Sequence, residues 1–248
     1  MFEEINNKNF DIVICVGPND IDIIKKQIYY TLKNILNYRN IYIIVPEKFK
    51  NLQIENSIII SENIFPFSLE TVSKYHGKLD RNGWYLQQLL KLYAGLIIPD
   101  ILDIYLVIDA DTFFLKPTIF YEDGRCLYNY GNEYHYMYFL HMQKLDKNLR
   151  KMDVNKSGIC HHMMFQTKYI KELFDIIEKN HNDLFYNIFL EKVTDYNHSG
   201  ASEYEIYFNF MLNKHPDKIK IRKLNWTNTN KLTEDTNYDY ISYHWYMR

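Results

Sequence analysis

The chain has 248 residues, a length that fits one domain and can bury a sizeable core. Its 29 Lys and Arg against 31 Asp and Glu give a formal net charge of -2, which excludes an overall electrostatic footprint for nucleic acid. Because the three cysteines lack metal-ligand spacing and no apolar run reaches bilayer length, we expect a soluble, cytoplasmic protein without a membrane span.

The first half of the sequence alternates apolar strands with helices. Four apolar runs predict strands, at residues 10–16, 41–45, 57–60 and 104–108. The first run ends at Gly17-Pro-Asn-Asp20, a loop that leads into a helix, and a second helix is predicted over 84–96. This order predicts an α/β fold with a mainly parallel central sheet flanked by helices, whose ligands bind outside the carboxyl ends of the strands.

The second half of the sequence is less regular. Its apolar spacing predicts a strand at 158–165, helices at 169–179 and 203–213, and an aromatic closing segment at 240–246. The sequence shows no internal repeat, low-complexity segment or clear linker. We therefore interpret the whole chain as one continuous domain.

Two carboxylates, Asp109 and Asp111, follow the strand at 104–108 directly and are separated only by Ala110. Residues i and i+2 of an extended segment point the same way about 6.5 Å apart, so the pair could reach one hard cation. Mg²⁺ and Mn²⁺ take oxygen ligands and usually complete their shell with water and substrate phosphates. Aspartates at this spacing also occur as solvated turn residues, and that alternative stays open here.

The helix at 84–96 carries an unusual polar face. Its apolar stripe is opposed by one aromatic ring, two amides and one ammonium, those of Trp84, Gln87, Gln88 and Lys91. These groups suit a nucleobase, a ribose and a phosphate better than the usual charges of a solvated face. Arg81 and Gly83, just before the helix, could extend a phosphate-binding loop.

In combination, these motifs resemble the GT-A class of nucleotide-sugar-dependent glycosyltransferases. The chain is most similar to a small subfamily, containing the Asp-x-Asp motif, of large DNA viruses and bacterial surface-polysaccharide loci. The motifs that carry the resemblance are Gly17–Asp20, Arg81–Lys91, Val107–Thr112, His161–Met163, Ser202–Glu205 and Tyr243–His244. Their order is the specific signal, and it covers most of the chain.

The resemblance implies a single Rossmann-like GT-A domain, with a nucleotide-binding half at 1–117 and an acceptor-binding half at 118–248. It implies that Asp109 and Asp111 bind Mn²⁺ or Mg²⁺ and the ribose of the donor, with Ala110 between them lining that site. It also implies that His244 completes the metal shell. A histidine packed among the surrounding aromatic residues is the alternative for His244.

The resemblance further places the uracil or ribose of the donor near Gly17 and Asp20. The nucleotide would be completed by the helix at 84–96 and the residue before it, with Arg81 and Lys91 as auxiliary countercharges to the diphosphate. The donor-binding residues expected on this basis are Gly17, Asp20, Arg81, Trp84, Gln87, Gln88, Lys91, Asp109, Ala110 and Asp111.

An inverting transferase needs a general base that deprotonates the acceptor hydroxyl. The candidates are Glu203 and Glu205, in Ser202-Glu-Tyr-Glu205. The same segment matches a capping box, in which Glu205 reaches back to the backbone amide of Ser202. We expect Glu203 as the base and Glu205 as the cap. One residue of the pair His161 and His162 should face the cleft and contact donor sugar or acceptor, and the sequence leaves open which.

The resulting hypothesis is a metal-dependent glycosyltransferase that moves a sugar from a UDP-sugar to a glycan hydroxyl, with inversion. If the source is viral, the compartment would be the host cytoplasm. A sugar-phosphate nucleotidylyltransferase is an alternative, although Val16–Asp20 lacks the glycine-rich, basic loop expected of one. A non-catalytic carbohydrate-binding protein of the same fold is a further alternative, which would have no need of the metal shell.

Overall fold

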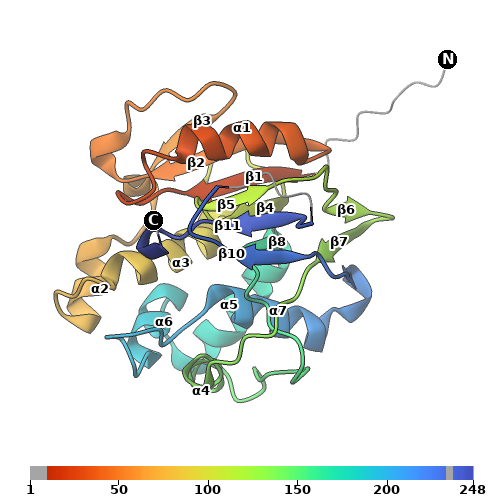
Figure 1. Ribbon diagram of the computed structural model, residues 1–248. Coiled ribbons are helices and arrows are strands. Elements are labelled where there is room, and N and C mark those ends of the chain that lie inside the picture. The colour runs from red at the N-terminus through yellow and green to blue at the C-terminus, as the bar shows by residue number, and fades with distance from the viewer. Residues whose placement is uncertain (1–9, 233–236, 248) are drawn as a thin grey trace.

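The computed structural model describes residues 10–232 and 237–247 and contains a central five-stranded sheet with helices on both sides (Figure 1). The strand order is β3-β2-β1-β4-β8, in which the first four strands are parallel and β8 runs antiparallel to β4. These strands are β1 (Phe10–Cys15), β2 (Tyr38–Val45), β3 (Ile58–Ser61), β4 (Ile104–Ile108) and β8 (His162–Gln166). The predicted α/β fold with a mainly parallel sheet is therefore confirmed.

Helices cover the two faces of this sheet. Figure 1 shows α1 (Ile24–Asn34) on one side, with α5 (Thr167–His181) and α7 (Glu203–Lys214) on the other. Further helices are α2 (Leu69–His76), α3 (Asn82–Ile97), α4 (Tyr136–Leu145) and α6 (Phe185–Lys192). The strands β1, β4 and β8 are buried almost throughout, as expected for the part of a sheet that is covered on both faces. The main cluster of buried side chains extends from Phe10 to Tyr240.

Two small sheets extend the fold. One pairs β6 (Tyr121–Glu122), β7 (Arg125–Tyr128) and β9 (Ile219–Ile221); the other pairs β10 (Trp226–Asn228), β11 (Tyr240–Ser242) and β5 (Thr112–Phe114). In the second sheet, β11 is antiparallel to β5, and the hydroxyls of Ser242 and Thr112 are hydrogen-bonded at 2.9 Å. This pairing carries the C-terminal segment to the turn that follows β4.

Several local predictions need correction. The strand expected at 158–165 begins only at His162, and the closing segment is a strand over Tyr240–Ser242 followed by a 3₁₀ turn, η4 (Trp245–Met247). Asp109 and Asp111 do not lie in an extended segment, because the amide of Thr112 donates to the carbonyl of Asp109 at 2.9 Å and closes a turn. The helices α2, α4 and α6 were not predicted.

The three cysteines, Cys15, Cys126 and Cys160, are buried free thiols, as their spacing suggested. Within residues 10–232 and 237–247, no helix combines the length and the apolar character needed to cross a bilayer.

Candidate active site

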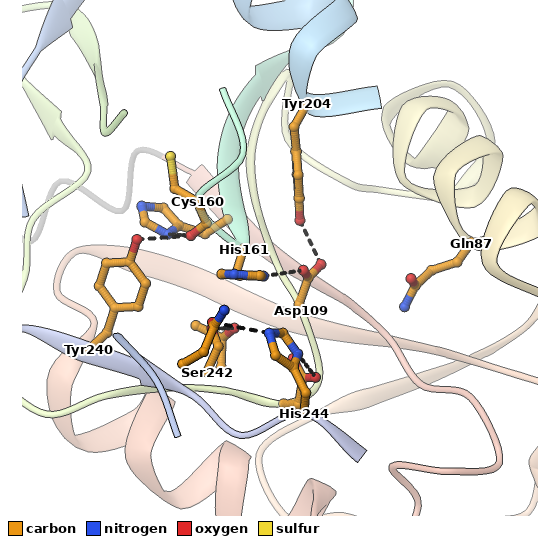
Figure 2. Close-up of polar contacts among 12 residues, drawn as sticks. Gln87, Asp109, Cys160, His161, Tyr204, Tyr240, Ser242 and His244 are labelled. Carbon is orange, nitrogen blue, oxygen red and sulfur yellow. Dashed lines mark hydrogen bonds and ion pairs between the residues drawn. The ribbon is translucent and has the colours of Figure 1, made fainter. Parts of the chain in front are cut away.

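Asp109 directly follows β4, and three side chains from distant parts of the sequence converge on it, of which Figure 2 shows Tyr204 and His161. The ammonium of Lys91 on α3 lies 2.6 Å from its Oδ1, and the hydroxyl of Tyr204 on α7 donates to the same oxygen at 2.7 Å. His161 Nδ1 lies 3.4 Å from Oδ2. The first aspartate of the pair is therefore fully engaged by protein groups.

Lys91 joins Asp109 to Glu203, the first residue of α7. Its ammonium lies 2.7 Å from the carboxylate of Glu203, and both side chains are buried. Burial lowers the pKa of Lys91, but the charges of Asp109 and Glu203 raise it by more than burial lowers it. The pKa of Lys91 is therefore above its ordinary value, and the amine stays protonated. Burial raises the pKa of Asp109, but the charges and hydrogen bonds of Lys91 and His161 together outweigh it and hold the pKa of that carboxyl below its usual range.

Asp111 faces a different partner, the C-terminal His244. The imidazole Nδ1 lies 2.8 Å from Oδ2 of Asp111, and Nε2 donates to the side-chain oxygen of Asn228 at 3.1 Å. Burial lowers the pKa of His244, yet its hydrogen bond to Asp111 and the charge of that carboxylate raise it above its ordinary value. The contact depends on β11, since β11 pairs with β5 and places His244 beside the turn.

The structure shows which of His161 and His162 faces the site, a point that the sequence left open. His161 precedes β8 and adopts a left-handed backbone with φ of 62°, a conformation that is costly for a residue with a Cβ. Its ring lies between Asp109 and His244, at a centroid distance of 4.9 Å from the latter. His162 points into the core, where its Nδ1 donates to the carbonyl of Cys160 and burial lowers its pKa to about 3. Thus His161 is the one that faces the site.

The polar face of α3 is used largely in packing. The Gln88 side chain is buried and accepts a hydrogen bond from the amide of Glu203 at 3.0 Å, which fixes the start of α7. Gln87 donates to the carbonyl of Cys15 at the end of β1, and the Arg81 guanidinium lies over the Trp84 ring. Trp84, Gln87 and Arg81 remain half-exposed, and their role in donor binding stays a prediction.

The loop after β1 forms the predicted turn. The amide of Asp20 donates to the carbonyl of Gly17 at 3.1 Å, and both residues are half-buried. Ala110 is buried between the two aspartates. A donor role for these three residues stays a prediction.

Glu205 is placed in the protein interior. Its backbone amide donates to the Ser202 hydroxyl, which caps α7 as expected. The side chain, however, does not complete a capping box, because it is bound by Ser157 at 2.5 Å and by Asn209 at 2.8 Å. This environment anchors α7 and keeps Glu205 buried.

Sequence reasoning missed two contributors to the site. Tyr204 lies between Glu203 and Glu205, the two candidate bases, and this position in the motif could have indicated that its side chain reaches the site. No sequence pattern indicated a role for Asn228, because its contact with His244 arises only when β10 and β11 pair.

A divalent cation fits part of this arrangement. Among the described residues, no group of three or more His, Cys, Asp or Glu side chains is arranged to hold a metal, so the predicted three-residue shell is not formed. Asp111 and His244 still provide an oxygen and a nitrogen in contact, and the Asn228 partner at Nε2 leaves Nδ1 directed toward Asp111. Mg²⁺ commonly binds through one or two carboxylates together with water and substrate phosphates.

The fold resembles solved glycosyltransferases. Galactosyltransferase LgtC, in complex with donor and acceptor sugar analogs, matches with a TM-score of 0.51 and 13% identity, covering 94% of this chain and 86% of LgtC. Apo mouse xyloside xylosyltransferase 1 matches with a TM-score of 0.46 and 10% identity, covering 89% and 87% of the two chains. At such low identity the likeness to LgtC establishes the fold, that of GT-A glycosyltransferases.

Among curated proteins, a sequence search finds no match. A family model does match, over residues 6–246, and the chain therefore belongs to DUF6492, a family of unknown function.

Proposed function

We propose that this protein is a metal-dependent glycosyltransferase that transfers a sugar from a nucleotide diphosphate donor, expected to be UDP, to a glycan hydroxyl. The observation that carries the proposal is the contact between Asp111 and His244, which lies in the turn directly after β4 and Asp109, at the carboxyl edge of the parallel strands. Ligands of open α/β sheets bind at this edge. The narrower resemblance to the subfamily of DNA viruses and polysaccharide loci stays a prediction, as does the single-domain organisation.

The charge of the site supports a cation-assisted diphosphate. Asp109, Asp111 and Glu203 are three nearby carboxylates, and the single positive charge of Lys91 is shared by Asp109 and Glu203. A diphosphate would be repelled by the remaining negative charge unless a cation accompanied it. When bound at Asp111 and His244, Mn²⁺ or Mg²⁺ would stabilise the charge that develops on the leaving diphosphate.

The protein's own residues position this centre. Lys91 and Tyr204 hold the Asp109 carboxylate, and Asn228 orients the His244 ring. Gln87 and the Gly17–Asp20 turn lie beside the end of β1, where we place the nucleoside. Each group is thus set before the donor arrives, which lowers the ordering cost of binding.

We further propose an inverting course with Glu203 as the base. Burial raises the pKa of Glu203 against the opposing charge of Lys91, which makes the carboxylate a stronger base. The anomeric configuration of the product, measured by NMR, tests this part separately. Retention of configuration would contradict it and return Glu203 to the task of holding Lys91.

Incubation with a panel of UDP-sugars and Mn²⁺, with and without EDTA, tests the function as a whole. We expect UDP release that depends on the metal and on one or a few donors. Absence of metal-dependent release with every donor would reject the transferase. Consumption of UTP and a sugar phosphate with pyrophosphate release would instead favour the nucleotidylyltransferase.

A further inference from the structure

A polar cavity of about 430 Å³ lies between the segment at 130–133, which follows β7, and the segment at 223–228, which includes β10. Its volume is within the range of small-ligand sites, about 300–1,000 Å³. Side chains that line it include Glu133, Lys223, Asn225 and Trp226. Amides, one carboxylate, one ammonium and an indole suit a ligand with many hydroxyls and an apolar ring face.

Both walls of the cavity are fixed by hydrogen bonds of their backbones. Gly131 and Ser157 exchange two backbone hydrogen bonds, at 2.8 and 3.0 Å, and a Cβ on Gly131 would come within 2.6 Å of the Ile159 carbonyl. On the other side, the Asn225 amide donates to the Asp239 carboxylate at 2.7 Å. The cavity therefore exists before any ligand binds.

The cavity adjoins the candidate active site at three points. Asn228, in its lining, accepts the hydrogen bond from His244, and the Trp226 ring meets the His161 ring at 5.0 Å. The charge of Glu133 is close enough to act on His244. Trp226 also stacks on Tyr240, which lies across His161 from Gln87 in Figure 2. The cavity and the α3 side, where we place the nucleoside, thus flank the same centre.

We propose that this cavity is the acceptor subsite and binds the terminal sugar of a neutral glycan. In this arrangement the half-exposed Trp226 ring packs against a sugar face, and Glu133 accepts hydrogen bonds from sugar hydroxyls. The inference rests on the proposed glycosyltransferase function, because it assigns the second substrate of the same centre. The lining contains one carboxylate, Glu133, and one ammonium, Lys223, so its formal charges balance, which favours a neutral glycan over a polyanionic one.

Binding of the purified full-length protein to an array of neutral glycans, with UDP and Mn²⁺ present, tests the subsite. Glu133→Gln preserves size and removes the charge, and Trp226→Leu removes the aromatic face but keeps an apolar side chain. We expect each to weaken binding of the best glycan at least about tenfold, the scale of one charged hydrogen bond or one large ring contact. Glu55→Gln, on an exposed residue outside this cavity, is the matched control and should leave glycan binding unchanged.

UDP affinity and acceptor-independent UDP release from the donor are measured on the same variants and should change much less than glycan binding, because we place the donor on the α3 side of the centre. Failure of wild type to bind any neutral glycan would overturn the subsite, and so would variants that lose UDP affinity while keeping glycan binding. If UDP-sugars are not turned over but the variants still lose glycan binding, the proposed transferase fails and the glycan site stands. The two proposals are thereby separable.

Discussion

At the residue scale, Asp109 and Asp111 have different partners. Asp109 forms an ion pair with Lys91, whereas Asp111 forms its ion pair with His244. We expect Asp111→Asn to reduce transfer by at least about 100-fold, the scale of removing one electrostatic contact to the transition state. The measurement is UDP release at saturating donor, together with Mn²⁺-dependent UDP binding.

Asp103→Asn provides the control for this change, because Asp103 is an exposed aspartate just before the other end of β4. Its activity should match wild type. Full turnover by Asp111→Asn would disqualify Asp111 as a metal ligand.

Asn228 is expected to act through His244. Asn228→Ala removes the acceptor at Nε2, so the ring loses the partner that fixes its tautomer and orientation. We predict a metal affinity lowered by about 10- to 100-fold, the usual effect of losing such a partner. Mn²⁺ titration followed by electron paramagnetic resonance checks this directly, with the exposed Asn230→Ala as control. An unchanged titration would mean that His244 has only a packing role.

Glu203→Gln separates a base from a donor-binding group. The amide keeps the shape of the side chain but cannot accept a proton, so transfer should fall while UDP affinity stays close to wild type. Calorimetric titration with UDP and Mn²⁺ provides the second readout. A parallel loss of UDP affinity would show that Glu203 acts through Lys91 and Asp109.

At the scale of elements, the position of α7 depends on close packing against the backbone at Gly158. A Cβ on Gly158 would lie 2.6 Å from the Tyr204 carbonyl and 2.6 Å from Cβ of Phe208. Gly158→Ala should therefore displace α7 and cost about 1–3 kcal/mol, as overpacking does. Gly83→Ala, where the new Cβ meets nothing within 4 Å, should be neutral or slightly stabilising. Urea denaturation measures both; equal stabilities would contradict this placement.

At this scale it is also clear which helices and strands could be predicted from the sequence. The strand β4 is a continuous apolar run, β1 is apolar except for Asp11, and α5 carries a clear amphipathic pattern, so their positions were predicted well. The helices α4 and α6 have little polar face, and β5 and β10 span three residues each. Such short or uniformly apolar segments have no period to read, and their structure depends on tertiary partners.

At the scale of the whole molecule, buried neutral histidines make stability depend on pH. His141 is fully buried, donates to the Phe189 carbonyl at 2.9 Å, and burial lowers its pKa to about 4. The unfolded chain, with a histidine pKa of about 6.5, binds the proton more readily. Stability from this group is therefore complete above pH 6.5 and declines as the pH falls toward 4.

His141→Gln retains a donor without a titrating ring, so its free energy of unfolding should fall less than that of wild type between pH 7 and 4.5. The difference is expected to be on the order of 2–3 kcal/mol. Chemical denaturation at the two pH values measures it. Identical pH profiles would show that His141 does not carry the effect.

The sequence by itself determined the α/β order, the aspartates at the end of β4 and the histidine near the C-terminus, because strand periodicity and chain order are local properties. Tertiary structure decided the rest. Which histidine faces the site, that Lys91 binds Asp109 and Glu203, and that Asn228 holds His244 all depend on segments more than 15 residues apart. These contacts follow from the pairing of β11 with β5 and the packing of α7 on α3, which no local pattern encodes.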